Sequence, residues 1–294
     1  MEMLNVLGPV VLITLIGFLM GRSKIDLHAG TLSTTVILVA TPALIFSTLT
    51  SIGVTIEMLL NMAASAFLSV TIAAVLGLIV VKVSGFSLRT YLPSLMFPNS
   101  GNMGLPLVLL AFGEEGLRLG VSYFFVIALL QHSVGFSIAS GSYRIVYLLK
   151  QPLIYAVAGV VLVVSTGIEV PEVILTTTDI LGGMMIPAML IMLGNSLAGL
   201  SIADFRPAII IACARLLIGV LSALIIIRLL SLEGPVAGTV FVMATMPTAI
   251  VTYVFAQRYR PDPGKIAGAV VASTLLTFLC LPVLLWGAGQ LAIL

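Results

Sequence analysis

The sequence predicts an all-α polytopic membrane protein, and its composition is the first observation behind this prediction. Sixty per cent of the 294 residues are hydrophobic and only 8% are charged, whereas soluble domains contain about 45–50% apolar and about 25% charged residues. A soluble fold of this length could not bury so much apolar surface, so lipid is the expected solvent. Because lipid cannot satisfy main-chain polar groups, each membrane segment is expected to be a helix.

The second observation is the regular division of the chain into apolar segments of membrane-spanning length. Clusters of charged and turn-forming residues separate ten such segments, and the loops between them are too short for an inserted soluble domain. A span needs about 20 apolar residues. The expected spans cover residues 4–21, 27–49, 56–81, 90–113, 117–141, 152–167, 172–199, 205–230, 235–257 and 264–290.

The distribution of basic residues predicts the orientation of these spans. Loops after the odd-numbered spans carry ten lysines and arginines, whereas loops after the even-numbered spans carry only Arg118 and Arg228. Because basic loops favour the cytoplasm, we expect both termini outside, in the inner membrane of the cell. The net charge of +2 and the absence of a basic face argue against nucleic acid as a partner. Cys213 and Cys280 lack metal-site spacing, and we expect no metal and no cofactor.

Short motifs recur in the second half of the chain at nearly constant offsets. The three pairs are Pro9-Val-Val-Leu with Pro152-Leu-Ile-Tyr, Pro42-Ala-Leu-Ile with Pro187-Ala-Met-Leu, and Phe97-Pro98-Asn99 with Met246-Pro247-Thr248. They predict two five-helix repeats, residues 1–145 and 146–294. Because five is odd, the second repeat is expected to be inverted in the membrane, as in many secondary transporters.

Span four contains a segment that is unsuited to a continuous helix. Residues 97–106 include two prolines, two glycines and three polar residues, and each proline removes a main-chain donor. A break here would place a half-helix amino terminus near the membrane midplane, where its amides can bind an anion. The residues expected to bind substrate are Pro98, Asn99, Ser100, Gly101 and Asn102.

Span nine carries the matching interruption at Pro247. Thr248, Ala249 and Thr252 complete the expected binding residues on this side. The alternative is an ordinary proline kink, which membrane helices tolerate. The match of Pro247 to the span-four break by repeat position favours a second broken helix that crosses the first.

Three ionisable residues fall inside predicted spans, where such residues are rare and suggest function. Asp179 in span seven is a coupling-proton site, a structural cap or pair, or a residue close enough to the outer surface to be in water. Arg215 in span eight either contacts substrate or helix ends, or is a structural counter-charge to Asp179 or to helix carboxyl ends. His132, beside Gln131 in span five, is either a proton relay or a neutral packing residue.

The broken-helix segments resemble those of a known family. Pro98-Asn-Ser-Gly-Asn-Met-Gly-Leu-Pro106 is similar to the first crossover of the auxin efflux carriers, and Met246-Pro247 through Tyr259 resembles their second. Thr178-Asp179 through Leu193-Gly194 is similar to their seventh span. The resemblance covers nearly the whole chain.

This resemblance implies the ten-span crossover fold shared with bile-acid and sodium/proton transporters. Spans 1, 2, 6 and 7 would form a scaffold, spans 3–5 and 8–10 a moving transport domain, and two chains a homodimer through the scaffold. Asn195 and Ser196 would line the scaffold side of the cavity, or else bond across helices. The short link at 142–151 is typical of compact prokaryotic members, which carry dicarboxylates such as malate or malonate. Thr252 stands where plant members have a second proline.

We therefore expect a secondary active transporter of a small mono- or dicarboxylate, with a coupling proton or sodium ion as a further partner. A cation/proton antiporter of the same architecture is the main alternative, but it would rely on acids in span five, where this chain has Gln131 and His132. A channel is the third alternative. No metalloprotease or serine-hydrolase motif is present, so an enzyme is not expected.

Overall fold

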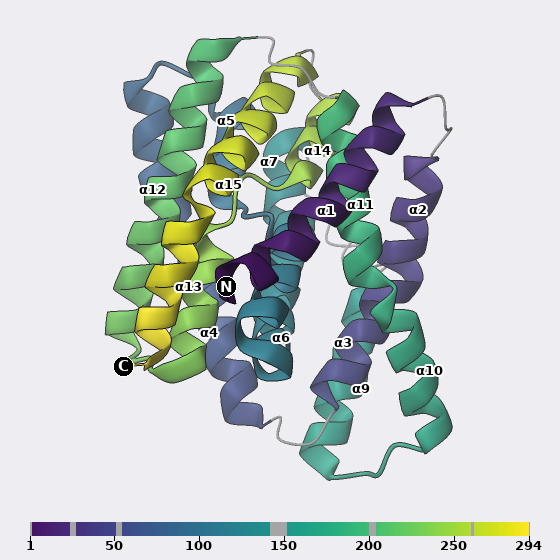
Figure 1. Ribbon diagram of the computed structural model, residues 1–294. Coiled ribbons are helices and arrows are strands. Elements are labelled where there is room, and N and C mark those ends of the chain that lie inside the picture. Colours follow the sequence, from purple (N-terminus) through teal and green to yellow (C-terminus); the bar gives the residue numbers. More distant parts are fainter. Residues whose placement is uncertain are drawn as a thin grey trace. The chain divides into compact units, whose positions relative to one another are not determined.

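The computed structural model describes residues 2–23, 28–50, 55–141, 152–199, 204–259 and 262–293, and in these ranges the regular structure is helical (Figure 1). The expected link between the repeats, at 142–151, lies outside the described residues. Six of the described helices are long and apolar enough to cross a membrane, and shorter apolar helices accompany them. A multi-pass helical protein is thus confirmed, while the count of ten spans in two repeats stays a prediction.

The chain divides into two compact units. The first unit contains residues 1–63, 101–125 and 145–199, and the second contains residues 64–100, 126–144 and 200–294. Each unit therefore combines pieces from both halves of the sequence. The two units are described separately below.

In the first unit, two helices pack at very short range because of small residues. α1 (Glu2–Arg22) lies along α11 (Met185–Gly199). A Cβ at Gly17 would collide with the main chain of Ile191, and one at Gly194 would collide with the Thr14 carbonyl. Membrane helices commonly associate through small residues in this way, because lipid gives them no hydrophobic reason to associate.

Two further helical segments of this unit are irregular just before a proline. A π-helical turn, η1 (Val36–Ala40), joins α2 (Ala29–Thr35) to α3 (Thr41–Leu49), whose second residue is Pro42. In the second half of the chain, α10 (Glu172–Gly183) gives way to α11 two residues before Pro187. Proline clashes with the preceding turn and lacks a donor, which accounts for both interruptions. α9 (Pro152–Thr166) packs against α3 and completes this group.

In the second unit, α12 (Phe205–Leu229), α13 (Gly234–Thr245) and α15 (Pro263–Ile293) pack on one another. α5 (Leu88–Met96) and α14 (Ile250–Tyr259) contact the same group. A mainly aliphatic core cluster includes Leu95 of α5, Ile211 and Ile218 of α12, and Val270 of α15. This cluster supports the end of α5.

The remaining helices connect the two units along the chain. α4 (Ile56–Val83) is continuous, whereas α6 (Leu105–Leu130) is bent at Gly113. Gly113 has φ 64° and ψ −154°, a conformation that only glycine adopts without strain, and it falls at the expected boundary between spans four and five. Another π-helical turn, η3 (Gln131–Gly135), leads into α7 (Phe136–Ser140).

Candidate functional site

Both helices that the sequence predicts to be broken are interrupted in the structure. α5 ends at Met96, its next residue Phe97 is extended, and helical structure resumes in a π-helical turn, η2 (Ser100–Gly104). α13 ends at Thr245, Met246 is extended with φ −60° and ψ 150°, and α14 begins at Ile250. An ordinary proline kink in span nine is therefore excluded.

The two extended segments, 97–99 and 246–249, pair with each other, and we call this pairing the crossover. The Asn99 N–H donates to the Pro247 carbonyl at 2.7 Å, and the Ala249 N–H donates to the Phe97 carbonyl at 3.1 Å. These bonds form an isolated antiparallel bridge between Pro98 and Thr248. The structure thus brings Pro98 and Asn99 of span four together with Pro247, Thr248 and Ala249 of span nine within the second unit.

Thr248 connects the crossover to two neighbouring helices. Its hydroxyl donates to the Ser94 carbonyl in α5 at 2.9 Å, and its N–H donates to the Ser273 hydroxyl in α15 at 3.1 Å. Thr252 donates its hydroxyl to the Ala249 carbonyl at 2.7 Å. Both hydroxyl protons already have protein acceptors, so these two residues support the crossover rather than offer free donors to a ligand.

Arg215 lies beneath the crossover and donates to the ends of both interrupted helices. Its guanidinium reaches the Leu95 carbonyl at 3.0 Å, the Ala244 carbonyl at 2.6 Å and the Met246 carbonyl at 3.2 Å. The side chain is only 2% exposed. Of the alternatives predicted for Arg215, these bonds support contact with helix carboxyl ends.

Asn99 and Gln131 carry buried donors without a protein acceptor. Their exposed fractions are 5% and 6%, and neither the Asn99 Nδ2 nor the Gln131 Nε2 has a hydrogen-bond partner among the described residues. In an extended segment the side chains of Phe97 and Asn99 leave on the same side. The Phe97 ring packs against Gly135, with 2.8 Å from a ring carbon to a Cβ built there, and Gly135 is four residues from Gln131. The crossover strand that carries Asn99 therefore contacts η3, the turn that carries Gln131, through Phe97 and Gly135.

His132 is held by its own helix and by an aromatic neighbour. Its Nδ1 lies 2.9 Å from the Ala128 carbonyl. Its ring meets that of Phe255 edge to face at 5.9 Å between centroids, and Phe255 also packs on Phe136. This surrounding matches the packing alternative predicted for His132.

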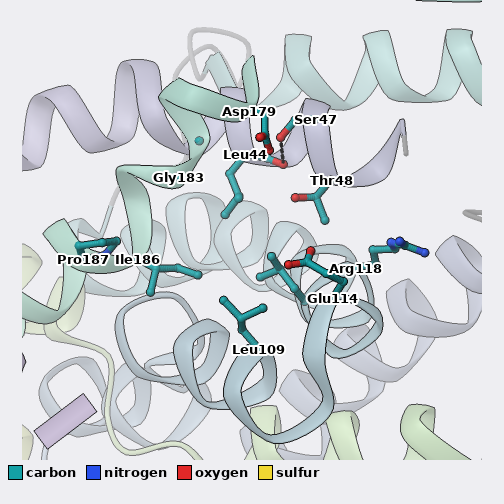
Figure 2. Close-up of a pocket in the computed structure, with 12 residues that line it drawn as sticks. Leu44, Ser47, Thr48, Leu109, Glu114, Arg118, Asp179, Gly183, Ile186 and Pro187 are labelled. Atoms are coloured by element: carbon teal, nitrogen blue, oxygen red, sulfur yellow. Dashed lines mark hydrogen bonds between the residues drawn. The ribbon is translucent and has the colours of Figure 1, made fainter. Parts of the chain in front are cut away.

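Asp179 belongs to the first unit, where it lines a separate cavity of about 400 Å³. Figure 2 shows the Asp179 carboxylate on the same side as Ser47 and Thr48, with Glu114 on the facing side and the Arg118 guanidinium turned away. The cavity wall is otherwise largely apolar. This arrangement gives Asp179 an accessible position, and the alternatives predicted for its role stay predictions.

The other expected residues occupy varied positions. Ser100 is buried, Asn102 is half-buried, and Gly101 faces the Phe124 ring, where a Cβ would come within 2.8 Å of a ring carbon. Asn195 and Ser196 are half-buried in α11. The Asn195 Oδ1 lies against Gly21 of α1, an arrangement in line with packing across helices.

Sequence reasoning missed Ser94, Ser273 and Gly219, which all surround the crossover. Small hydroxyl residues give no distinctive sequence signal in apolar helices. Gly219 lies four residues after Arg215, so both are on one face of α12, and this spacing is a signal that could have identified it.

A family model described as "Membrane transport protein" matches this chain twice, over residues 3–146 and 139–285. The chain is also 30% identical over 304 aligned positions to a Methanocaldococcus jannaschii protein named "Uncharacterized transporter MJ1031". That alignment covers 95% of this chain and 97% of the archaeal protein. The two family matches taken together, and the alignment to the archaeal protein, each extend over nearly the full length of this chain. They therefore include the crossover and both units.

Proposed function

This chain belongs to the membrane transport protein family, the family of the auxin efflux carriers, and we propose that it is a secondary active transporter of a small organic anion. The substrate class is a mono- or dicarboxylate, bound at the crossover and carried by alternating access. Membership of this family identifies the protein as a membrane transporter rather than an enzyme.

The observation that carries the proposal is the pair of buried carboxamide donors beside the crossover. A buried N–H without an acceptor costs about 1–3 kcal/mol, so a folded protein rarely keeps one without a reason. Asn99 and Gln131 each offer such a donor on facing elements. A carboxylate supplies acceptor oxygens only, and it could therefore satisfy both donors at once.

The charges around the crossover also favour an anion. Residues 97–99 and 246–249 contain no ionisable side chain, and the buried cation Arg215 lies against them. The first turn of α14 follows directly after Ala249, and a helix amino terminus carries partial positive charge. A cation/proton antiporter would need carboxylates at such a crossing, so this alternative is not favoured.

The transport cycle is proposed to move one group of helices past the other. The two successive family matches support two repeats, which we take to be inverted. The division into two compact units is in line with a scaffold and a transport domain, but residues 101–125 of spans four and five fall in the unit that holds spans 1, 2, 6 and 7. We further propose a homodimer with both termini outside the inner membrane. Asp179 is the candidate for coupling to a proton or sodium gradient, because it is exposed in a cavity.

The test uses purified protein in liposomes on a solid-supported membrane. Acetate, lactate, malonate, malate and succinate are applied in turn, with and without a proton or sodium gradient. We expect saturable currents or fluxes for one class of carboxylate, accelerated when the same anion is present on the opposite side. Flux that does not saturate or counter-exchange would indicate a channel. Currents driven by sodium or protons alone, with no response to any carboxylate, would overturn the proposal.

A further inference from the structure

We propose that Arg215 is the positioning and specificity-determining residue of the transport site, because one buried guanidinium joins the carboxyl ends of both interrupted helices. This inference rests on the proposed function, and it goes further by naming the source of selectivity for negative charge. Arg215 itself does not touch the substrate in this proposal. It acts through the helix ends that it binds.

The geometry of the guanidinium is the first support. One nitrogen donates to the end of α5, through Leu95, and the other two donate to the end of α13, through Ala244 and Met246. The two helix ends are separated by about 150 residues of sequence but share one planar donor group. A planar fork with several fixed donors can do this, whereas a single ammonium cannot.

The packing of α12 is the second support. Gly219 lies one helical turn from Arg215, and a Cβ there would stand 2.6 Å from the Ala244 carbonyl oxygen and 3.0 Å from the Thr245 Cα. Only glycine therefore lets α12 approach the end of α13 so closely. This approach allows the short arginine-to-carbonyl bond of 2.6 Å.

Electrostatics connects this geometry to selectivity. Each helix carboxyl end carries about −0.5 of a charge and each amino end about +0.5. Where two interrupted helices cross, the four ends would nearly cancel, and an anion would gain little. Arg215 covers the two negative ends with one positive charge, so that the amino end of α14 faces the ligand uncancelled.

The charge of Arg215 itself does not change with pH. Arginine cannot lose its proton in a protein, so its contribution to the crossover stays positive under all physiological conditions. Any pH dependence of transport must then come from the substrate or from another residue, such as His132 beside Gln131 or Asp179. The crossover would select negatively charged substrates, and a different residue would couple transport to an ion gradient.

The test separates the joining role from the charge role with two variants and a matched control. Arg215→Gln removes the charge and most donors, Arg215→Lys keeps the charge on one nitrogen, and Arg228→Gln changes an exposed arginine in the last turn of the same helix. Hydrogen–deuterium exchange of protein in lipid nanodiscs reports on peptides that contain the Asn99 and Ala249 amides. Equilibrium binding of acetate and malonate reports on selectivity.

We expect Arg215→Gln to speed exchange in both crossover peptides together, roughly ten-fold or more, while peptides from α1 and α11 are unchanged. Arg215→Lys should open the same peptides but keep more anion affinity than Arg215→Gln. The Arg228→Gln control should resemble the wild type. If Arg215→Gln fails to fold, Gly219→Ala provides the second route, because it pushes α12 from the end of α13 and should open the same two peptides.

Wild-type protection of either crossover peptide in the folded Arg215→Gln protein would overturn the joining role. Equal anion affinity in Arg215→Lys and Arg215→Gln would overturn the role of the positive charge. If Arg215 were purely structural, the anion affinity of each variant would change only as far as its amide exchange changes. If the wild type bound neither acetate nor malonate, the proposed function for these anions would fail. The exchange measurement would still decide whether Arg215 joins the two helix ends.

Discussion

Replacing Asn99 with leucine should weaken anion binding while leaving the empty protein at least as stable. Leucine has a similar size and shape but no donor. The Asn99 Nδ2 is buried and has no acceptor among the described residues, so its removal deletes an unsatisfied group rather than a bond. Loss of affinity together with retained stability is the signature of a donor that serves a ligand.

The expected magnitudes follow from the same donor. A buried N–H without an acceptor costs about 1–3 kcal/mol, and Asn99→Leu should recover part of this in the free energy of unfolding of the empty protein. A hydrogen bond to a charged group contributes about 1.5–3 kcal/mol. Since each 1.4 kcal/mol is a factor of ten, affinity should fall by about ten- to 150-fold.

The assay is a binding isotherm for the carboxylate identified in the liposome screen, measured on monodisperse protein beside a thermal unfolding curve. Asn61→Leu, at an exposed position in α4, is the matched control for affinity and should leave the binding isotherm unchanged. Unchanged affinity in Asn99→Leu would move the site away from the crossover. A large loss of stability would show instead that Asn99 satisfies the protein's own main chain.

Other predictions concern coupling, topology and packing. Asp179→Asn should lose gradient-driven uptake in liposomes yet keep anion exchange; full concentrative uptake by the folded variant would exclude the coupling role. In a background without native cysteines, Glu114→Cys should react with an impermeant thiol reagent on intact cells and Arg22→Cys should not, and the reverse would invert the proposed topology. Gly194→Ala should lower the melting temperature, because the added Cβ meets the main chain of α1 and overpacking typically costs about 1–3 kcal/mol. Gly199→Ala on the same helix, where the new Cβ meets nothing within 4 Å, is the control for that measurement.

The interruption of span four could be predicted because its cause is local. Two prolines and two glycines within residues 97–106 make a continuous helix unfavourable whatever surrounds them. Span nine, with Pro247 as its strongest signal, needed the comparison with the first half of the chain. In both places the main-chain chemistry of proline acts within one turn of its own position.

The partners of Arg215 could not be predicted, because they depend on contacts between distant segments. Its bonds reach carbonyls 29, 31 and 120 residues away in sequence, and main-chain carbonyls are the same at every position. From the sequence, substrate, helix ends and Asp179 were all alternative partners for this cation. Only the close approach of α12 to α13, allowed by Gly219, favours the helix ends.

The crossover has a consequence for how the second unit can move. It is a sheet of one residue pair, in which Pro98 cannot donate a further bond and the Thr248 donors are already committed to α5 and α15. A shift of segment 97–99 along segment 246–249 by a single residue would break both hydrogen bonds of the bridge. The shift would bring proline nitrogens, which cannot donate, into the donor positions. Within a bilayer, water cannot compensate for main-chain groups left open in this way. The crossover therefore cannot act as a sliding contact, and the two extended segments that it joins must move as one body.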